Sequence, residues 1–359
     1  MPLEVEESKP GTGAKDFIMK VLNGISIAVV VTLVPQALIG ELFTALLPIF
    51  PQGQTLIDLV QLTGTMLPAI IGVMVALEFK MTPMQIASVG IASVLGSGVA
   101  QPMETGGFHL SGTGLVINSG LTAAMAVGLL LWIGDRLGSY TIILLSTTVV
   151  VVVGTIGWVV TYPIVEVFTK WLGHLVNGAT ELQPMIMGLI LAVLFSILIV
   201  SPISTVGIAT AIMMEGVSSG AANLGVCAMG ISIMIAGYKV NGFGTSLIHV
   251  LGSSKVQMAN FFAHPKAALP GISSAAIVGM VGGIFSIPGT AISAGFGNSG
   301  FAGPLAALNY EGWGWTVGNV GVVLLCFFIL PIVLGFFFNW LYGTKLGWIS
   351  PEFYKLNFN

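Results

Sequence analysis

The stretch SYTIILLSTTVVVVVGTIGWVVTYPIV, residues 139–165, decides the fold class because it contains no charged residue. A membrane-spanning helix needs roughly 20 consecutive, mostly apolar residues. The β-branched part, TTVVVVVG at 147–154, is continuous, whereas the strands of a membrane barrel alternate apolar and polar residues over about ten positions. An unpaired backbone polar group is costly in lipid, and a helix satisfies its backbone hydrogen bonds internally. This run is therefore predicted to be a transmembrane helix.

The whole chain has the same character. Of its 359 residues, 55% are hydrophobic and 7% are charged, and the mean hydropathy is +0.99. A soluble domain is typically about one quarter charged. The formal net charge is −3, and the sequence has no clustered basic patch of the kind that binds nucleic acid. We therefore expect no nucleic-acid partner. The lipid bilayer must therefore solvate much of the chain.

The apolar runs predict an all-α polytopic membrane protein of about ten transmembrane helices, with boundaries that are uncertain by several residues. The predicted helices are residues 17–46, 57–78, 84–101, 114–134, 139–165, 184–200, 203–215, 220–238, 268–287 and 315–341. A single membrane domain, 17–342, then lies between polar cytoplasmic tails at 1–16 and 343–359. No cleavable signal peptide precedes the first helix.

Orientation follows from the Lys/Arg bias of short loops. With both termini cytoplasmic, most basic residues fall on the cytoplasmic side, and only Lys170 falls outside. The cytoplasmic set is Lys15, Lys20, Lys80, Arg136, Lys239, Lys255, Lys266, Lys345 and Lys355.

Three stretches between the predicted helices are rich in Gly, Ser, Thr and Asn, yet are too apolar for ordinary exposed loops: 102–113, 241–266 and 288–304. Non-helical backbone at membrane depth is tolerated where it is buried or lines a watery cavity. We expect at least two of the three to be re-entrant segments. Flexible surface loops are the alternative.

Internal sequence similarity predicts a duplication, with halves at about 57–165 and 184–341. Pro68 and Gly72 match Pro184 and Gly188, and SVGIAS at 88–93 matches TVGIAT at 205–210. Duplicated halves are common in secondary transporters, where the substrate is held between them. Compositional similarity of Gly/Ala-rich helices is the alternative, and parallel and inverted arrangements both stay open.

Several longer strings carry a family resemblance. They are PMIMGLILAVLFSILIVSPISTVGIATAI at 184–212, GAANLGVCAMG at 220–230, GFGTSLIHVLGSSKVQMANFFAHPKAALPGI at 242–272 and GFGNSGFAGPL at 295–305, with VLNGISIAVVVTLVPQALIGEL at 21–42 and GLVINSGLTAAMAVG at 114–128. Together they resemble the membrane EIIC component of bacterial phosphotransferase-system sugar permeases (the EIIC type 2 domain), in the subgroup of toxin regulators named after PfoR.

This resemblance implies a multi-pass permease of the bacterial cytoplasmic membrane that imports a sugar, and it implies a homodimer. It also implies soluble IIA and IIB partners, which relay phosphate from phosphoenolpyruvate. The tails are too short to hold these domains of about 100 residues, so we expect separate IIA and IIB proteins. No catalytic domain is expected in this chain, which would act as the membrane subunit of a sugar phosphotransferase.

The glycine-rich segments also supply candidate ligands. Ionisable groups at membrane depth usually mark a pathway, and a sugar site needs convergent amides, hydroxyls, carboxylates or imidazoles. The candidate substrate-binding residues are Glu104, His109, Asn118, Asn241, Thr245, His249, Gln257, Asn260, Asn298 and Ser299. We expect Glu104, His109, His249 and Asn298 to surround one cavity near the bilayer midplane, where 102–113, 241–260 and 290–303 meet. Each residue could instead be a helix cap, a turn residue or an interhelical packing contact.

No metal-ligand spacing, phosphate-binding loop or nucleophile elbow is present, so no metal or cofactor is expected. Two other functions stay open. A carrier coupled to an ion or to protons would need a deep protonatable residue, for which Glu104 and His249 are candidates. A membrane sensor would bind the solute without moving it. The sequence does not name the sugar.

Overall fold

The computed structural model describes residues 13–47, 49–134, 136–138, 141–290 and 293–356. The first half contains α1 (Ala14–Leu46), α2 (Gly53–Thr65), α3 (Leu67–Glu78), α4 (Pro83–Ser97), β1 (Ala100–Pro102), β2 (Phe108–Leu110), α5 (Val116–Ile133), α6 (Thr141–Thr147), α7 (Gly154–Ile156) and α8 (Tyr162–Thr180). The second half contains α9 (Pro184–Ile199), α10 (Thr205–Ala211), α11 (Val217–Asn241), α12 (Phe243–Ser246), α13 (Met258–Ala263), α14 (Leu269–Ile284), α15 (Ala302–Asn309), α16 (Val317–Leu324) and α17 (Leu330–Asn339).

The prediction of an all-α polytopic membrane protein is confirmed. Six helices in the described residues are long and apolar enough to cross a membrane, or seven if the bent pair α2–α3 counts as one span. Three shorter apolar helices, Pro83–Ser97, Pro184–Ile199 and Phe243–Gly252, accompany them. The described strands form one antiparallel hairpin, in which Gln101 faces His109.

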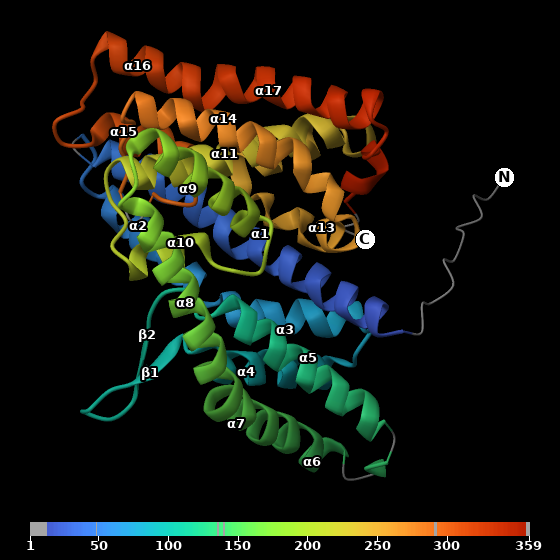
Figure 1. Ribbon diagram of the computed structural model, residues 1–359. Coiled ribbons are helices and arrows are strands. Elements are labelled where there is room, and N and C mark those ends of the chain that lie inside the picture. Colours follow the sequence, from blue (N-terminus) through green and yellow to red (C-terminus); the bar gives the residue numbers. More distant parts are fainter. Residues whose placement is uncertain (1–12, 48, 135, 139–140, 291–292, 357–359) are drawn as a thin grey trace.

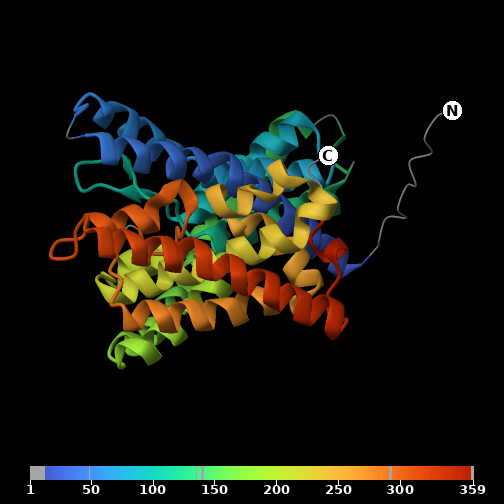
Figure 2. The same ribbon diagram turned by 90° about the horizontal axis from the view of Figure 1, so that it is seen from above.

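The helices form two groups with α1 between them (Figures 1 and 2). One group contains α9, α11, α14 and α17, whose buried side chains include Leu191, Met229 and Val278. The other contains α3, α4, α5 and the helical run from α6 to α8, and it shares a core with α1 through Ile25 and Ile71.

Glycines bring the helices into close contact. Gly188 of α9 and Gly279 of α14 face each other, and a Cβ atom on either would overlap the carbonyl oxygen of the other. A Cβ atom on Gly72 of α3 would likewise overlap the backbone of Val89 and Gly90 in α4. Small residues allow such backbone contacts between membrane helices, where van der Waals packing replaces the hydrophobic effect.

Three predicted spans differ in detail from the structure. The predicted helix 57–78 is bent by 47° between α2 and α3, where Pro68, at the start of α3, lacks an N–H for the helix ladder. The predicted helix 203–215 shrinks to the seven residues of α10. The helix that contains 144–165 continues to Thr180, and its polar end holds the ion pair Glu166–Lys170 at 3.0 Å.

Candidate functional site

Residues 242–263 form a first hairpin, which leaves the end of α11 and returns to the same place. Asn241 donates a side-chain hydrogen bond to the Tyr354 carbonyl oxygen (2.8 Å), and Asn260 donates one to the Lys355 carbonyl oxygen (2.8 Å). The two limbs therefore both contact the C-terminal segment. Gly252 and Ser253 lie at the tip, where a π-helical turn gives way to extended backbone.

Residues 288–290 and 293–309 belong to a second hairpin, which enters from the opposite end of α11. Gly289 and Gly216 exchange two backbone hydrogen bonds, of 2.9 and 3.0 Å, just before α11 begins. The chain then reaches its tip at Gly295–Ser299 and returns through α15 toward α16 (Figure 1). Gly295 and Gly297 at this tip have φ of 92° and 59°, which an L side chain rarely adopts.

The two tips meet beside the middle of α11. Ser299 donates its hydroxyl hydrogen to the Gly252 carbonyl oxygen. The second tip also touches α11, because Asn298 donates to the Cys227 sulfur at 3.0 Å. The first tip places the His249 carbonyl against Gly230. Cys227 and Gly230 flank the centre of the 25-residue helix, so for a membrane-spanning α11 the tips lie near the bilayer midplane.

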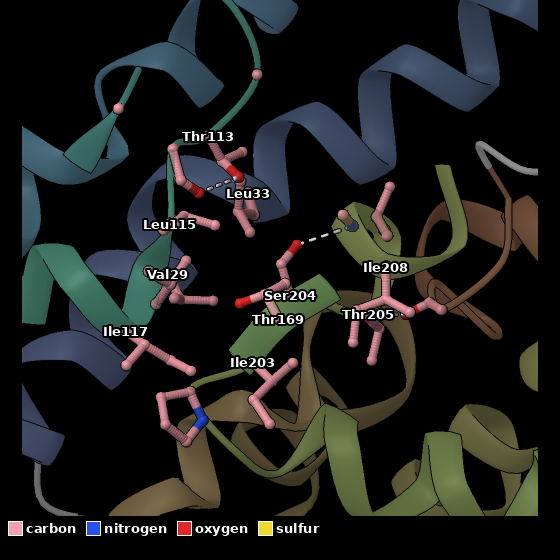
Figure 3. A pocket seen from close by; sticks show the side chains of 18 of the residues that line it. Val29, Leu33, Thr113, Leu115, Ile117, Thr169, Ile203, Ser204, Thr205 and Ile208 are labelled. Atoms are coloured by element: carbon pink, nitrogen blue, oxygen red, sulfur yellow. Dashed lines mark hydrogen bonds between the residues drawn. The ribbon is translucent and has the colours of Figure 1, made fainter. Parts of the chain in front are cut away.

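A cavity of about 730 Å³ lies against these tips. Its size falls within the usual range for small-molecule sites, roughly 300–1,000 Å³. Thr113, Leu115 and Ile117 line one side, and Ser204 of the α9–α10 connection and Thr205 at the start of α10 line another (Figure 3). All three glycine-rich segments contribute to the wall, through 111–114, through 252, 253 and 255, and through 295, 296 and 299.

The wall combines apolar surface with hydroxyl groups. Val29 and Leu33 of α1 supply apolar side chains, whereas Ser204, Thr169 and Ser253 supply hydroxyls. A sugar presents hydroxyls that both donate and accept hydrogen bonds, around a ring that also has apolar C–H surface. The cavity therefore suits a small polar solute.

Lys255 is a buried cation in this wall, with 4% of its surface exposed. Its ammonium group donates to the carbonyl oxygens of Ser201 at 2.8 Å and Ile203 at 2.6 Å, just beyond the end of α9. The Lys/Arg bias of the loops predicts that Lys255 lies on the cytoplasmic side. The signal that could have found it is a lone lysine inside an apolar, glycine-rich stretch, where an ionisable group is costly.

Among the predicted site residues, Ser299 lines the cavity. Three others are exposed and outside it: Glu104 and His109 belong to the β-hairpin segment, and Thr245 lies in α12. The cavity instead uses the base of that hairpin, at Gln101 and Ser111. The expected ring of Glu104, His109, His249 and Asn298 around one cavity does not form, because the segment 102–113 becomes an exposed hairpin.

Four predicted side chains bind elsewhere around the first hairpin. Asn241 and Asn260 hold the C-terminal segment, and buried Gln257 donates to the Tyr354 carbonyl oxygen at 2.8 Å. The Gln257 amide also lies 3.3 Å from Nε2 of His249, which is buried. These residues are close to one another, but the polar group they face is the backbone of the chain's own C-terminal segment.

Asn118 and Asn298 are buried inside the protein. Asn118 donates to the carbonyl oxygens of Gly96 and, at 3.0 Å, Gly157, and so joins α5 to its two neighbours. Asn298 donates to the Phe327 carbonyl oxygen at 2.9 Å as well as to Cys227. Each retains a buried side-chain oxygen without a hydrogen-bond partner. Solute binding by these asparagines stays a prediction.

No group of three or more His, Cys, Asp or Glu side chains capable of holding a metal ion occurs in the described part of the chain. The cavity wall itself offers Glu166 and His174 together with hydroxyls and backbone carbonyls.

The fold defines a multi-pass membrane protein with a cavity between broken helices. The family model described as "Phosphotransferase system, EIIC" matches residues 19–356. The chain therefore belongs to the EIIC family, the membrane permease components of phosphotransferase systems. No curated protein and no solved structure gives a significant match to it.

Proposed function

We propose that this chain is the permease through which a phosphotransferase system imports a sugar or a similar small polar solute. The observation that carries the proposal is the meeting of the two hairpin tips, at Gly252 and Ser299, beside the cavity. Broken helices at mid-depth expose backbone amides and carbonyls, which can replace the hydration shell of a polar solute.

The binding elements in this proposal are the three glycine-rich segments, which contact the solute through small side chains and backbone groups. Ser299 and Ser253 act from the hairpin tips, and Ser204 acts from the α9–α10 connection. Val29 and Leu33 exclude water from the apolar face of the solute. This arrangement matches the general pattern of a mainly apolar pocket with a few placed polar groups.

Membership of the EIIC family supports separate IIA and IIB partners as phosphate donors. The chain would act as a homodimer in the bacterial cytoplasmic membrane, with both termini cytoplasmic. The structure supports placing both termini on one side, because α1 and the C-terminal segment share a small pocket lined by Lys20, Asn23 and Lys355.

Uptake by liposomes containing the purified protein tests the proposal. Uptake of radiolabelled sugar that requires phosphoenolpyruvate and soluble phosphotransferase proteins supports it, and the sugar should appear inside as its phosphate. Uptake driven by a pH gradient alone would instead identify an ion-coupled carrier. Binding without uptake under either condition would identify a sensor.

A further inference from the structure

Lys255 contributes a positive charge to the cavity wall that no acidic side chain neutralises. The other charged side chains of the wall are Glu166 and Lys170, which pair with each other at 3.0 Å. These two are substantially exposed, with 37% and 66% of their side-chain surface accessible, whereas Lys255 is buried. Within the described residues, no carboxylate lies within ion-pairing distance of Lys255. When Lys255 is protonated, the cavity therefore has an excess of one positive charge.

The groups that hold the Lys255 ammonium are neutral carbonyls. Those of Ser201 and Ile203 are close, and that of Leu198 is more distant at 3.5 Å. They follow the C-terminal end of α9, where the helix dipole is negative but amounts to only about half an elementary charge. A buried ion is costly unless it is paired and hydrogen-bonded, so these carbonyls compensate the ammonium only in part.

Two hydroxyls beside Lys255 can also serve an anion. Ser204 accepts the backbone N–H of Gly207 at 3.0 Å, and Ser253 accepts the backbone N–H of Lys255 at 3.3 Å. Both side chains line the cavity. Because a hydroxyl that accepts retains its own hydrogen, each can still donate one hydrogen bond. Charge-assisted hydrogen bonds to an anion are stronger than those to a neutral group.

We propose that the solute in this cavity carries a negatively charged group, a carboxylate or a phosphate, and that the Lys255 ammonium is its counter-ion. The inference rests on the proposed transport function and specifies the substrate class of the same site. The anion has two sources with shared chemistry. It belongs to the imported solute, as in a sugar acid, or to the phosphorylated product before its release.

Matched pairs of ligands test the proposal on the full chain in detergent micelles by isothermal titration calorimetry. The first arm compares gluconate, galactonate and xylonate with their neutral alditols glucitol, galactitol and xylitol. The second arm compares glucose 6-phosphate with glucose. We expect at least one anion to bind about tenfold or more tightly than its neutral counterpart. A preference confined to the second arm identifies the product phosphate as the source.

Variants assign that preference to Lys255. K255M removes the charge at nearly constant side-chain length and should reduce the preference to within about twofold, whereas K255R should retain it. K345M is the matched control, because it removes an exposed lysine that does not line the cavity and should leave the preference nearly unchanged.

The proposal is overturned if every anion fails to bind, if the neutral compounds bind as tightly as the anions, or if K255M retains the full preference. The ligand comparison on the wild-type protein decides the matter even if K255M does not fold. Phosphoenolpyruvate-dependent uptake of a neutral sugar without anion preference would refute this inference alone. Anion binding without any uptake would refute the transport function and leave Lys255 as an anion site.

Discussion

Ser299 donates its hydroxyl hydrogen to the carbonyl oxygen of Gly252, and this bond joins two hairpins that enter the helix bundle from opposite ends. The two residues are 47 positions apart in the chain. Both line the cavity, so the same contact closes one wall of the proposed solute site. Replacing either tip residue should therefore affect solute handling as well as stability.

S299A should lower stability and solute uptake together. The substitution leaves the Gly252 carbonyl without this donor, and an unsatisfied buried group costs about 1–3 kcal/mol. Thermal unfolding in detergent and phosphoenolpyruvate-dependent uptake measure the two effects. S273A is the control, because Ser273 bonds to the Tyr342 hydroxyl at 2.9 Å and does not line the cavity. S273A should leave uptake unchanged, and equal loss of uptake in both variants would argue against a special role for the tips.

G279A should destabilise the protein because its methyl group would overlap the Gly188 carbonyl and the Ala192 side chain. Overpacking of this kind costs about 1–3 kcal/mol. G128A is the matched control, since a Cβ atom added to Gly128 in α5 would meet no atom within 4 Å. It should be neutral or stabilise the helix by up to about 1 kcal/mol. Similar melting temperatures for the two variants would refute the close α9–α14 contact.

Tyr354 should make stability depend on pH above about 10. Burial raises the pKa of its phenol above the usual value near 10. A group whose folded pKa is raised contributes stability that is fully present below the unfolded pKa and is lost as the pH rises above it. Y354F also lacks the 2.7 Å hydrogen bond to the Ala267 carbonyl. It should therefore be less stable than the wild type below pH 10, and this difference should shrink at higher pH. A constant difference up to pH 11.5 would contradict the prediction.

Asn118 tests whether a buried polar residue near the cavity serves packing or binding. N118A removes the donor to Gly96 and Gly157, and we expect a loss of about 1–3 kcal/mol of folding free energy. Solute affinity of the folded fraction should change little, because Asn118 does not line the cavity. N309A, at an exposed position, is the control. Normal stability with abolished binding would instead support the role expected from the sequence.

E104Q should leave solute affinity unchanged within about twofold, which calorimetry resolves as less than about 0.5 kcal/mol. The physical reason is that Glu104 is exposed on the hairpin and does not line the cavity. Gln101 lies at the base of the same hairpin and lines the cavity, so Q101A is the contrasting variant. A large loss of affinity in E104Q would show that the hairpin folds over the cavity when solute binds.

Which charged side chains line the cavity could not be predicted from the sequence. The Lys/Arg loop bias predicts that Lys255 lies on the cytoplasmic side, because a lysine between two apolar helices is usually solvated. Its burial depends on the hairpin 242–263, which carries it to carbonyls more than 50 positions away in the chain. The hydrogen-bond partners of the Asn241, Gln257 and Asn260 side-chain amides could not be predicted either, because these partners lie in the distant C-terminal segment.

The sequence by itself determined the helical membrane class, most of the long helices and the three glycine-rich segments that border the cavity. These features are local, because continuous apolar runs must satisfy their backbone hydrogen bonds within one helix in lipid. The tertiary structure alone decided which polar side chains face the cavity and which are used in packing. That choice depends on contacts such as Ser299–Gly252 and Lys255–Ser201, between residues distant in the chain. Sequence spacing does not encode such contacts, since they follow from how the broken helices pack against α11.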